Sequence, residues 1–163
     1  MAQKTSSSLI AELGQYLGMD GLCFGPTESC QLVFDQTQVV TMIHDKAKER
    51  ITLNCPISSP DQYESMSRHT MRAMLQANFM GQGCADSTLS YGSDQRAYLQ
   101  VVVPLRDSPS CELRGALELL LNQVDVWSKR LVQAGNANHD EDAEHVGGVR
   151  KFNAQRAVGM QRV

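Results

Sequence analysis

The sequence has no long hydrophobic run, no strong excess of one charge and no secretory leader pattern. Apolar runs such as 119–121 are far too short to span a bilayer. The apolar residues near the N-terminus are separated by Glu12, Gly14 and Gln15 and form no continuous apolar core. We therefore expect no signal peptide and a protein that stays in the cytoplasm. Lys plus Arg number 15 and Asp plus Glu 18, for a net charge of −3. Because phosphate backbones attract clustered positive charge, this balance argues against nucleic-acid and acidic-membrane binding.

Recognised catalytic and metal-binding motifs are also missing. The five cysteines are odd in number and widely spaced, which fits neither a disulfide framework nor a zinc site, so we expect free thiols. Gly81 and Gly83 resemble part of a dinucleotide loop, but they follow a helix rather than a strand. His139 and His145 lie beside acidic residues, where a metal is conceivable and solvated side chains are favoured. We therefore expect no catalytic residue, no cofactor and no metal.

The chain does contain the periodicities of an α+β domain. Its 163 residues, 42% of them hydrophobic, suffice for one domain with a core. Apolar spacing, β-branched runs and Ser-Pro helix starts predict helices over 5–18, 59–81 and 108–135 and strands over 30–35, 38–44, 50–55, 88–91 and 96–103. The order α-β-β-β-α-β-β-α with short links predicts an antiparallel sheet packed by helices.

The last helix and the tail are expected to differ in character. Gly135 is expected to end the helix, whose length exceeds what a small domain needs and leaves part of it for an interface. Beyond it, acidic and then basic residues follow with few large apolar ones. We expect a domain over 1–134 and a flexible or loosely docked tail over 135–163.

Methionines gather in the predicted middle helix. Met66, Met71, Met74 and Met80 suit an adaptable partner surface because the thioether side chain is flexible. The same spacing is also typical of an ordinary core. The pattern alone leaves both interpretations open.

Four stretches together resemble the class I type III secretion chaperones, the Tir chaperone family. They are LIAELGQYLGMDGLCFGPTESCQLVFD (9–35), ANFMGQGCADSTLSY (77–91), YLQVVVPL (98–105) and ELRGALELLLNQVDVWSKRL (112–131). The resemblance covers roughly 9–132 and is carried by the order of apolar patterns and glycine breaks.

The resemblance implies a homodimer with a twisted antiparallel sheet and no enzymatic activity. Family members are bacterial cytoplasmic proteins that hold the N-terminal segment of secreted effectors in extended form and keep it secretion-competent. The secretion ATPase or the export gate is a candidate further partner, while nucleic acid and membrane insertion are not expected.

By the same resemblance, two sets of apolar residues have expected roles. The effector-binding set is Leu9, Leu13, Leu17, Leu32, Phe34, Val40 and Met42. The dimer-interface set is Met71, Met74, Leu75, Leu89 and Tyr91. Each of these residues is equally compatible with a plain hydrophobic core.

Two other functions remain open at this point. A regulatory sequestering partner, of the anti-activator type, would use the same fold and groove. A small α+β enzyme with an unrecognised site would need a pocket with converging polar groups.

Overall fold

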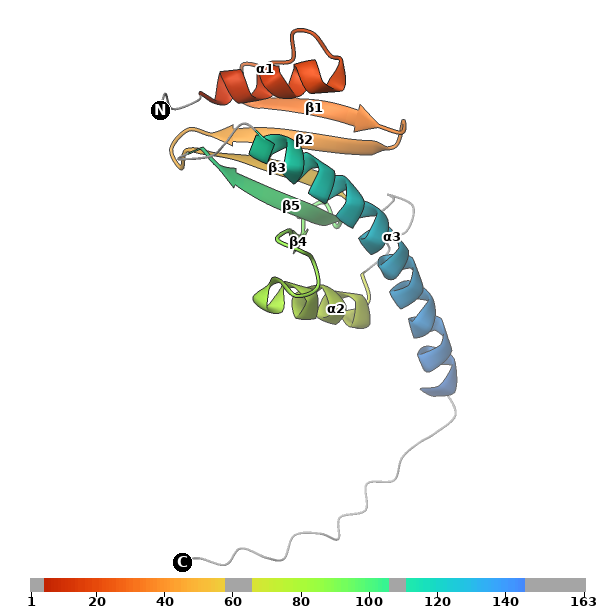
Figure 1. Ribbon diagram of the computed structural model, residues 1–163. Helices are drawn as coiled ribbons and strands as arrows, with labels where there is room; N and C mark the ends of the chain where they lie inside the picture. The colour runs from red at the N-terminus through yellow and green to blue at the C-terminus, as the bar shows by residue number, and fades with distance from the viewer. Residues whose placement is uncertain (1–4, 58–65, 106–110, 146–163) are drawn as a thin grey trace, which may run out of the picture.

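The computed structural model describes residues 5–57, 66–105 and 111–145, which form a five-stranded antiparallel sheet with helices against it (Figure 1). The strand order is β1-β2-β3-β5-β4. The strands are β1 Ser29–Phe34, β2 Gln38–Asp45, β3 Arg50–Pro56, β4 Thr88–Tyr91 and β5 Ala97–Pro104. The predicted order of elements is confirmed, with a short 3-10 turn added after the second helix.

Alternation along the strands separates a buried face from an open one. Leu32 lies opposite Val40, and Leu53 lies between Met42 and Val101, so residues of one parity meet across the sheet in the core. The other parity faces outward and includes Val33, which is 63% exposed, and the exposed Ile43 and Val102. Apolar side chains of the α-helices pack with the buried face of the sheet in one core.

Helix α1, Ser6–Leu17, begins at Thr5, whose side chain accepts a hydrogen bond from the Ser8 N–H. It ends at Gly18, whose φ of 68° is a left-handed cap that glycine adopts without strain. Gly14 lets the following loop pack closely, since a Cβ there would lie 2.8 Å from the Leu22 Cβ. Figure 1 shows α1 running beside β1 at one side of the sheet.

Helix α3, Cys111–His145, crosses the sheet and extends past its edge (Figure 1). The apolar side chains on one face of this helix are buried in the core: Leu113, Leu117, Leu120, Val124 and Trp127. The expected end at Gly135 is wrong, because the helix continues to His145. A glycine inside a helix costs about 1 kcal/mol relative to alanine, which one residue in a long helix tolerates.

Helix α2, Arg68–Asn78, is capped by Ser67, whose hydroxyl accepts a hydrogen bond from the Thr70 N–H. The helix start expected at Ser59 lies outside the described residues, and Met66 precedes α2 instead of lying on it. The turn η2, Phe79–Gly81, follows, with Met80 at a φ of 55°. Figure 1 shows α2 beyond β4, away from α1. No described helix has the length and apolar content that crossing a membrane requires.

Candidate partner-binding site

The residues expected to bind an effector come together in space, but most of them are covered. Five are at most 3% exposed: Leu9, Leu13, Leu32, Val40 and Met42. Leu17 and Phe34 are partly buried at the border of this core. Because α1 packs on the strands through the first five, those five hold the helix in place in this subunit. Their assignment to an effector groove stays a prediction, and Leu17 and Phe34 are its accessible members.

The edge of β1 offers main-chain groups that a second chain could use. The His44 N–H donates to the Glu28 carbonyl over 2.8 Å, which marks a hydrogen-bonded pair. Such pairs alternate along an antiparallel ladder, so the main-chain groups of Gln31 and Val33 turn away from β2. Within the described part of the chain, no hydrogen bond occupies these outward groups of Gln31 and Val33. This edge is therefore open to an added strand.

The opposite edge of the sheet is closed by a side chain. The Asn78 Nδ2 donates to the Leu89 carbonyl over 2.8 Å, and the Leu89 N–H donates to the Asn78 Oδ1 over 2.9 Å. One amide thus satisfies both outward main-chain groups in the middle of β4, as a neighbouring strand would. The two edges are unequal, and only that of β1 is free at its centre.

We expect Asn78→Ala to destabilise the protein, because it leaves two main-chain groups of the buried Leu89 without partners. A loss of about 2 kcal/mol or more in the free energy of unfolding follows from the cost of such groups. Urea unfolding measures it. The same change at the exposed Asn122 should have little effect, and equal losses in the two variants would contradict the capping role.

The residues expected at a dimer interface divide between surface and core. Met71 and Tyr91 are exposed and Leu75 is 71% exposed, whereas Met74 and Leu89 are buried. The exposed members therefore define a surface of the subunit, while Met74 and Leu89 support it from below.

Two further residues extend this surface: Met80, which the methionine pattern offered as a partner residue, and Phe79, which sequence reasoning missed. Phe79 is 70% and Met80 77% exposed. Phe79 continues the i, i+4, i+8 spacing of Met71 and Leu75, which was the available signal. We call Met71, Leu75, Phe79 and Met80 the α2 stripe. An apolar stripe of this kind on a protein surface typically marks an interaction site.

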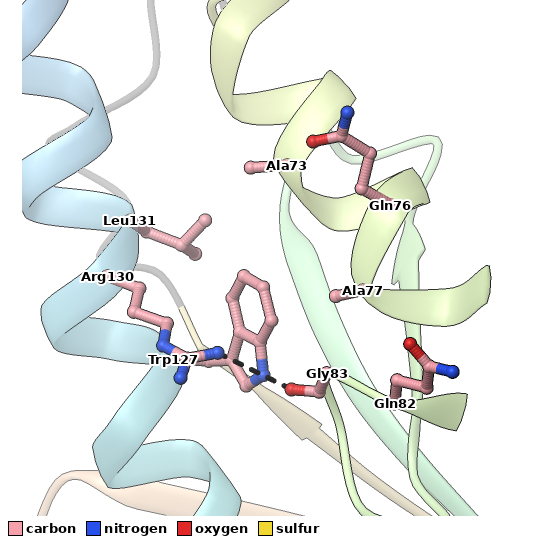
Figure 2. A pocket seen from close by; sticks show the side chains of 8 residues that line it. All are labelled: Ala73, Gln76, Ala77, Gln82, Gly83, Trp127, Arg130 and Leu131. Atoms are coloured by element: carbon pink, nitrogen blue, oxygen red, sulfur yellow. Dashed lines mark hydrogen bonds between the residues drawn. The ribbon is translucent and has the colours of Figure 1, made fainter. Parts of the chain in front are cut away.

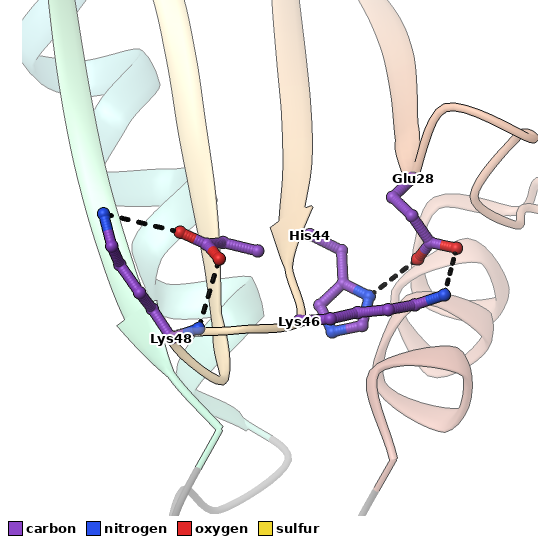
Figure 3. A network of polar contacts seen from close by, with 5 residues as sticks. Glu28, His44, Lys46 and Lys48 are labelled. Atoms are coloured by element: carbon purple, nitrogen blue, oxygen red, sulfur yellow. Dashed lines mark hydrogen bonds and ion pairs between the residues drawn. The ribbon is translucent and has the colours of Figure 1, made fainter.

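Polar contacts fasten the loop between α1 and β1 to the sheet (Figure 3). The Glu28 carboxylate accepts hydrogen bonds from Lys46 Nζ at 2.6 Å and from His44 Nδ1 at 2.9 Å. Phe24 stacks on the His44 ring, with 5.6 Å between centroids. The Lys46 ammonium first, and the His44 ring second, hold the pKa of the Glu28 carboxyl below its usual value. These contacts position the segment that leads into the open strand β1.

We expect Glu28→Gln to remove a pH-dependent part of the stability. A lowered folded-state pKa stabilises the protein fully above the ordinary carboxyl value of 4.5, and the contribution is lost as pH falls below it. The stability difference between wild type and variant should therefore shrink on acidification, which urea midpoints from neutral pH to about pH 3 can follow. Asp20→Asn, at an exposed carboxyl, is the control. A pH-independent difference would contradict the role of Glu28.

Two of the described cysteines have the chemistry of inert thiols. Cys23, Cys30, Cys55 and Cys84 are free. Burial first, and the neighbouring Cys23 second, raise the pKa of Cys30 to about 11, and burial raises the pKa of Cys55 to about 11. Since the thiolate is the reactive form, neither is nucleophilic at neutral pH. In the ranges that the structure describes, no three His, Cys, Asp or Glu residues are grouped to hold a metal ion.

Comparison with known proteins identifies the sequence family. Residues 8–128 match the model of the Tir chaperone protein (CesT) family. No curated protein sequence matches the chain.

Solved structures of the same fold include complexes of a chaperone with another protein. The ExsC-ExsE complex contains a chain of TM-score 0.67 and 18% identity, over 77% of this chain and 92% of that one. The HopA1-SchA chaperone-effector complex contains a chain of TM-score 0.63 and 18% identity, over 75% of this chain and 91% of that one. The complex of the Yersinia pestis type III secretion chaperone SycH with a fragment of YscM2 contains a chain of TM-score 0.60 and 16% identity, over 75% of this chain and 98% of that one. The family model spans most of the chain and these structures share its fold; the chain therefore belongs to the Tir chaperone protein (CesT) family.

Proposed function

We propose that this protein is a type III secretion chaperone. It binds the N-terminal segment of one or more effectors in extended form, keeps them soluble and secretion-competent, and delivers them to the secretion apparatus. The observation that carries the proposal is the open edge of β1 in a member of a chaperone family. Structures of this fold include a chaperone-effector complex and a type III secretion chaperone bound to a protein fragment, and both support it.

The geometry suits an extended client rather than a folded one. A strand added beside Gln31 and Val33 gains main-chain hydrogen bonds that do not depend on sequence. Its alternate side chains can contact the partly buried Phe34 and Leu17, members of the predicted effector-binding set. Because the main chain supplies most of the contacts, one chaperone can accept clients of different sequence.

The α2 stripe supports a homodimer. In a two-fold dimer the same surface meets itself, so one exposed apolar stripe on each subunit is sufficient to form an interface. Met71 and Leu75 of the predicted set lie on this stripe, and the exposed Tyr91 of the neighbouring β4 belongs to the same predicted interface.

We assign no catalytic activity to the protein. Capture of an extended segment by main-chain pairing and apolar contacts requires no reactive group. With this function we expect the protein in the bacterial cytoplasm, with the secretion ATPase or export gate as a further partner. Of the tail expected over 135–163, the part up to His145 continues α3, and 146–163 lie outside the described residues.

Affinity capture from the native organism tests the function. Tagged full-length protein should recover a secreted protein, identified by mass spectrometry, whose N-terminal segment is sufficient for binding. Recovery of a regulatory protein without any secreted one would reject the proposal and favour the sequestering function. A small-molecule substrate turned over by the purified chain would favour the enzyme.

A further inference from the structure

A cleft of about 460 Å³ lies between α2 and α3, within the size range of ligand pockets. Figure 2 shows the indole of Trp127 pointing from α3 into the space that α2 and the following turn enclose. The lining residues are Ala73, Gln76, Ala77, Gln82, Gly83, Trp127, Arg130 and Leu131. The cleft is at the β4 end of the sheet, whereas the open edge of β1 is at the other end.

Small residues create the room in this cleft. A Cβ at Gly83 would lie 2.6 Å from the Ala77 Cβ, so the chain can pack against α2 at this point only with glycine. The Gly83 N–H donates to the Ala77 carbonyl over 3.1 Å, which holds the turn in place. Together with Ala73, these residues leave room beside α2 for the cleft that Trp127 also lines.

The hydrogen-bond donors of this cleft are only partly used. Trp127 is 3% exposed, and its buried Nε1 has no hydrogen-bond partner. The Arg130 guanidinium lies 5.1 Å from the centre of the Trp127 ring and donates one long bond, 3.4 Å, to the Gly83 carbonyl. No carboxylate lines the cleft, and no ion pair with Arg130 occurs among the described residues. A buried donor without an acceptor is costly, so the site favours a ligand that brings one.

We propose that this cleft binds a carboxylate carried beside an apolar side chain in a peptide segment of a partner protein. The apolar group packs on Trp127 and Leu131, and the carboxylate accepts hydrogen bonds from the Trp127 Nε1–H and the Arg130 guanidinium. Charge complementarity selects this ligand, because the lining supplies a cation and neutral amides but no anion.

A peptide segment fits the cleft better than a second copy of this subunit. Ala73 and Ala77 lie across α2 from Met71 and Leu75, at 100° per residue, so the α2 stripe faces away from the cleft. The residues of the stripe also carry no carboxylate. That the segment belongs to a secreted client rests on the proposed function, whereas the preference for a carboxylate does not.

The single tryptophan of the chain makes the site directly observable. In the full-length ¹⁵N-labelled protein, one indole N–H signal reports on Trp127. We expect acetyl-Leu-Phe-Asp-amide, titrated into the millimolar range, to move this signal downfield with saturation. Acetyl-Leu-Phe-Asn-amide should bind about tenfold more weakly, since it lacks the charge-assisted hydrogen bonds.

One arginine variant and one lysine variant of α3 give a matched comparison. Arg130→Gln should lower the affinity for the Asp peptide about tenfold. Lys129→Gln, at the exposed neighbouring position, should change that affinity less than about twofold. Equal affinity for the two peptides, equal loss in the two variants, or no movement of the indole signal would overturn the proposal. A signal that moves with protein concentration alone would overturn it in favour of a second copy. None of these results affects client capture by the wild-type chain, so the proposed function is tested separately.

Discussion

Leu75→Asp is expected to convert the protein from a dimer into a monomer. Leu75 is the centre of the α2 stripe and is 71% exposed in the single subunit, so a charge there is solvated in the monomer. In a two-fold dimer the substitution places two carboxylates in one apolar interface. Each would cost several kcal/mol to bury unpaired, which is more than enough to dissociate a micromolar dimer.

Sedimentation equilibrium or light scattering measures this result. The wild type should have a mass near twice 18.0 kDa and the variant the mass of one chain, with unchanged circular dichroism. Val126→Asp introduces the same charge at another partly exposed helical position and should leave the dimer intact. A wild-type monomer at micromolar concentration, or a dimeric Leu75→Asp variant, would remove the α2 stripe from the interface.

Val33→Pro is expected to abolish strand addition at the edge of β1 while leaving the sheet folded. The Val33 N–H turns away from β2, so proline removes no bond of the ladder but deletes a donor that an added strand needs. The ring also obstructs an approaching main chain. We expect at least about a hundredfold weaker binding of the captured client, because several main-chain bonds depend on this contact.

The matched variant is Val33→Thr, which keeps the N–H and the β-branched shape. It should bind the client as the wild type does, and both variants should retain the dimer mass. Isothermal titration with the purified client segment measures the affinities. Undiminished binding by the proline variant would show that the client docks elsewhere.

The strands could be predicted almost to the residue because their signal is local. The turn at 92–95 placed a strand over 88–91, where the structure has β4 Thr88–Tyr91, and β-branched residues placed one over 38–44, where β2 is Gln38–Asp45. Period-two burial requires only that one face of the sheet be covered, whatever covers it. The helix end was less predictable, since Gly135 is a weak stop that helix continuation overrides.

The roles of apolar residues could not be predicted in the same way. Leu13 and Leu17 share a face of α1, yet Leu13 is in the core and Leu17 is at its border. Met74 and Leu75 are neighbours, yet one is buried and the other exposed. Composition is the same for a core and for a partner surface, so only the placement of surrounding elements separates them.

By itself the sequence determined the α+β order, the positions of the strands and the resemblance to secretion chaperones, since these follow from periodicity and from motifs along the chain. The tertiary structure alone decided which sheet edge is open, because the Asn78 amide reaches β4 only after α2 has packed beside it. It also decided that Trp127 faces a cleft with an unused donor. Both outcomes depend on contacts between segments distant in sequence, which no local pattern encodes.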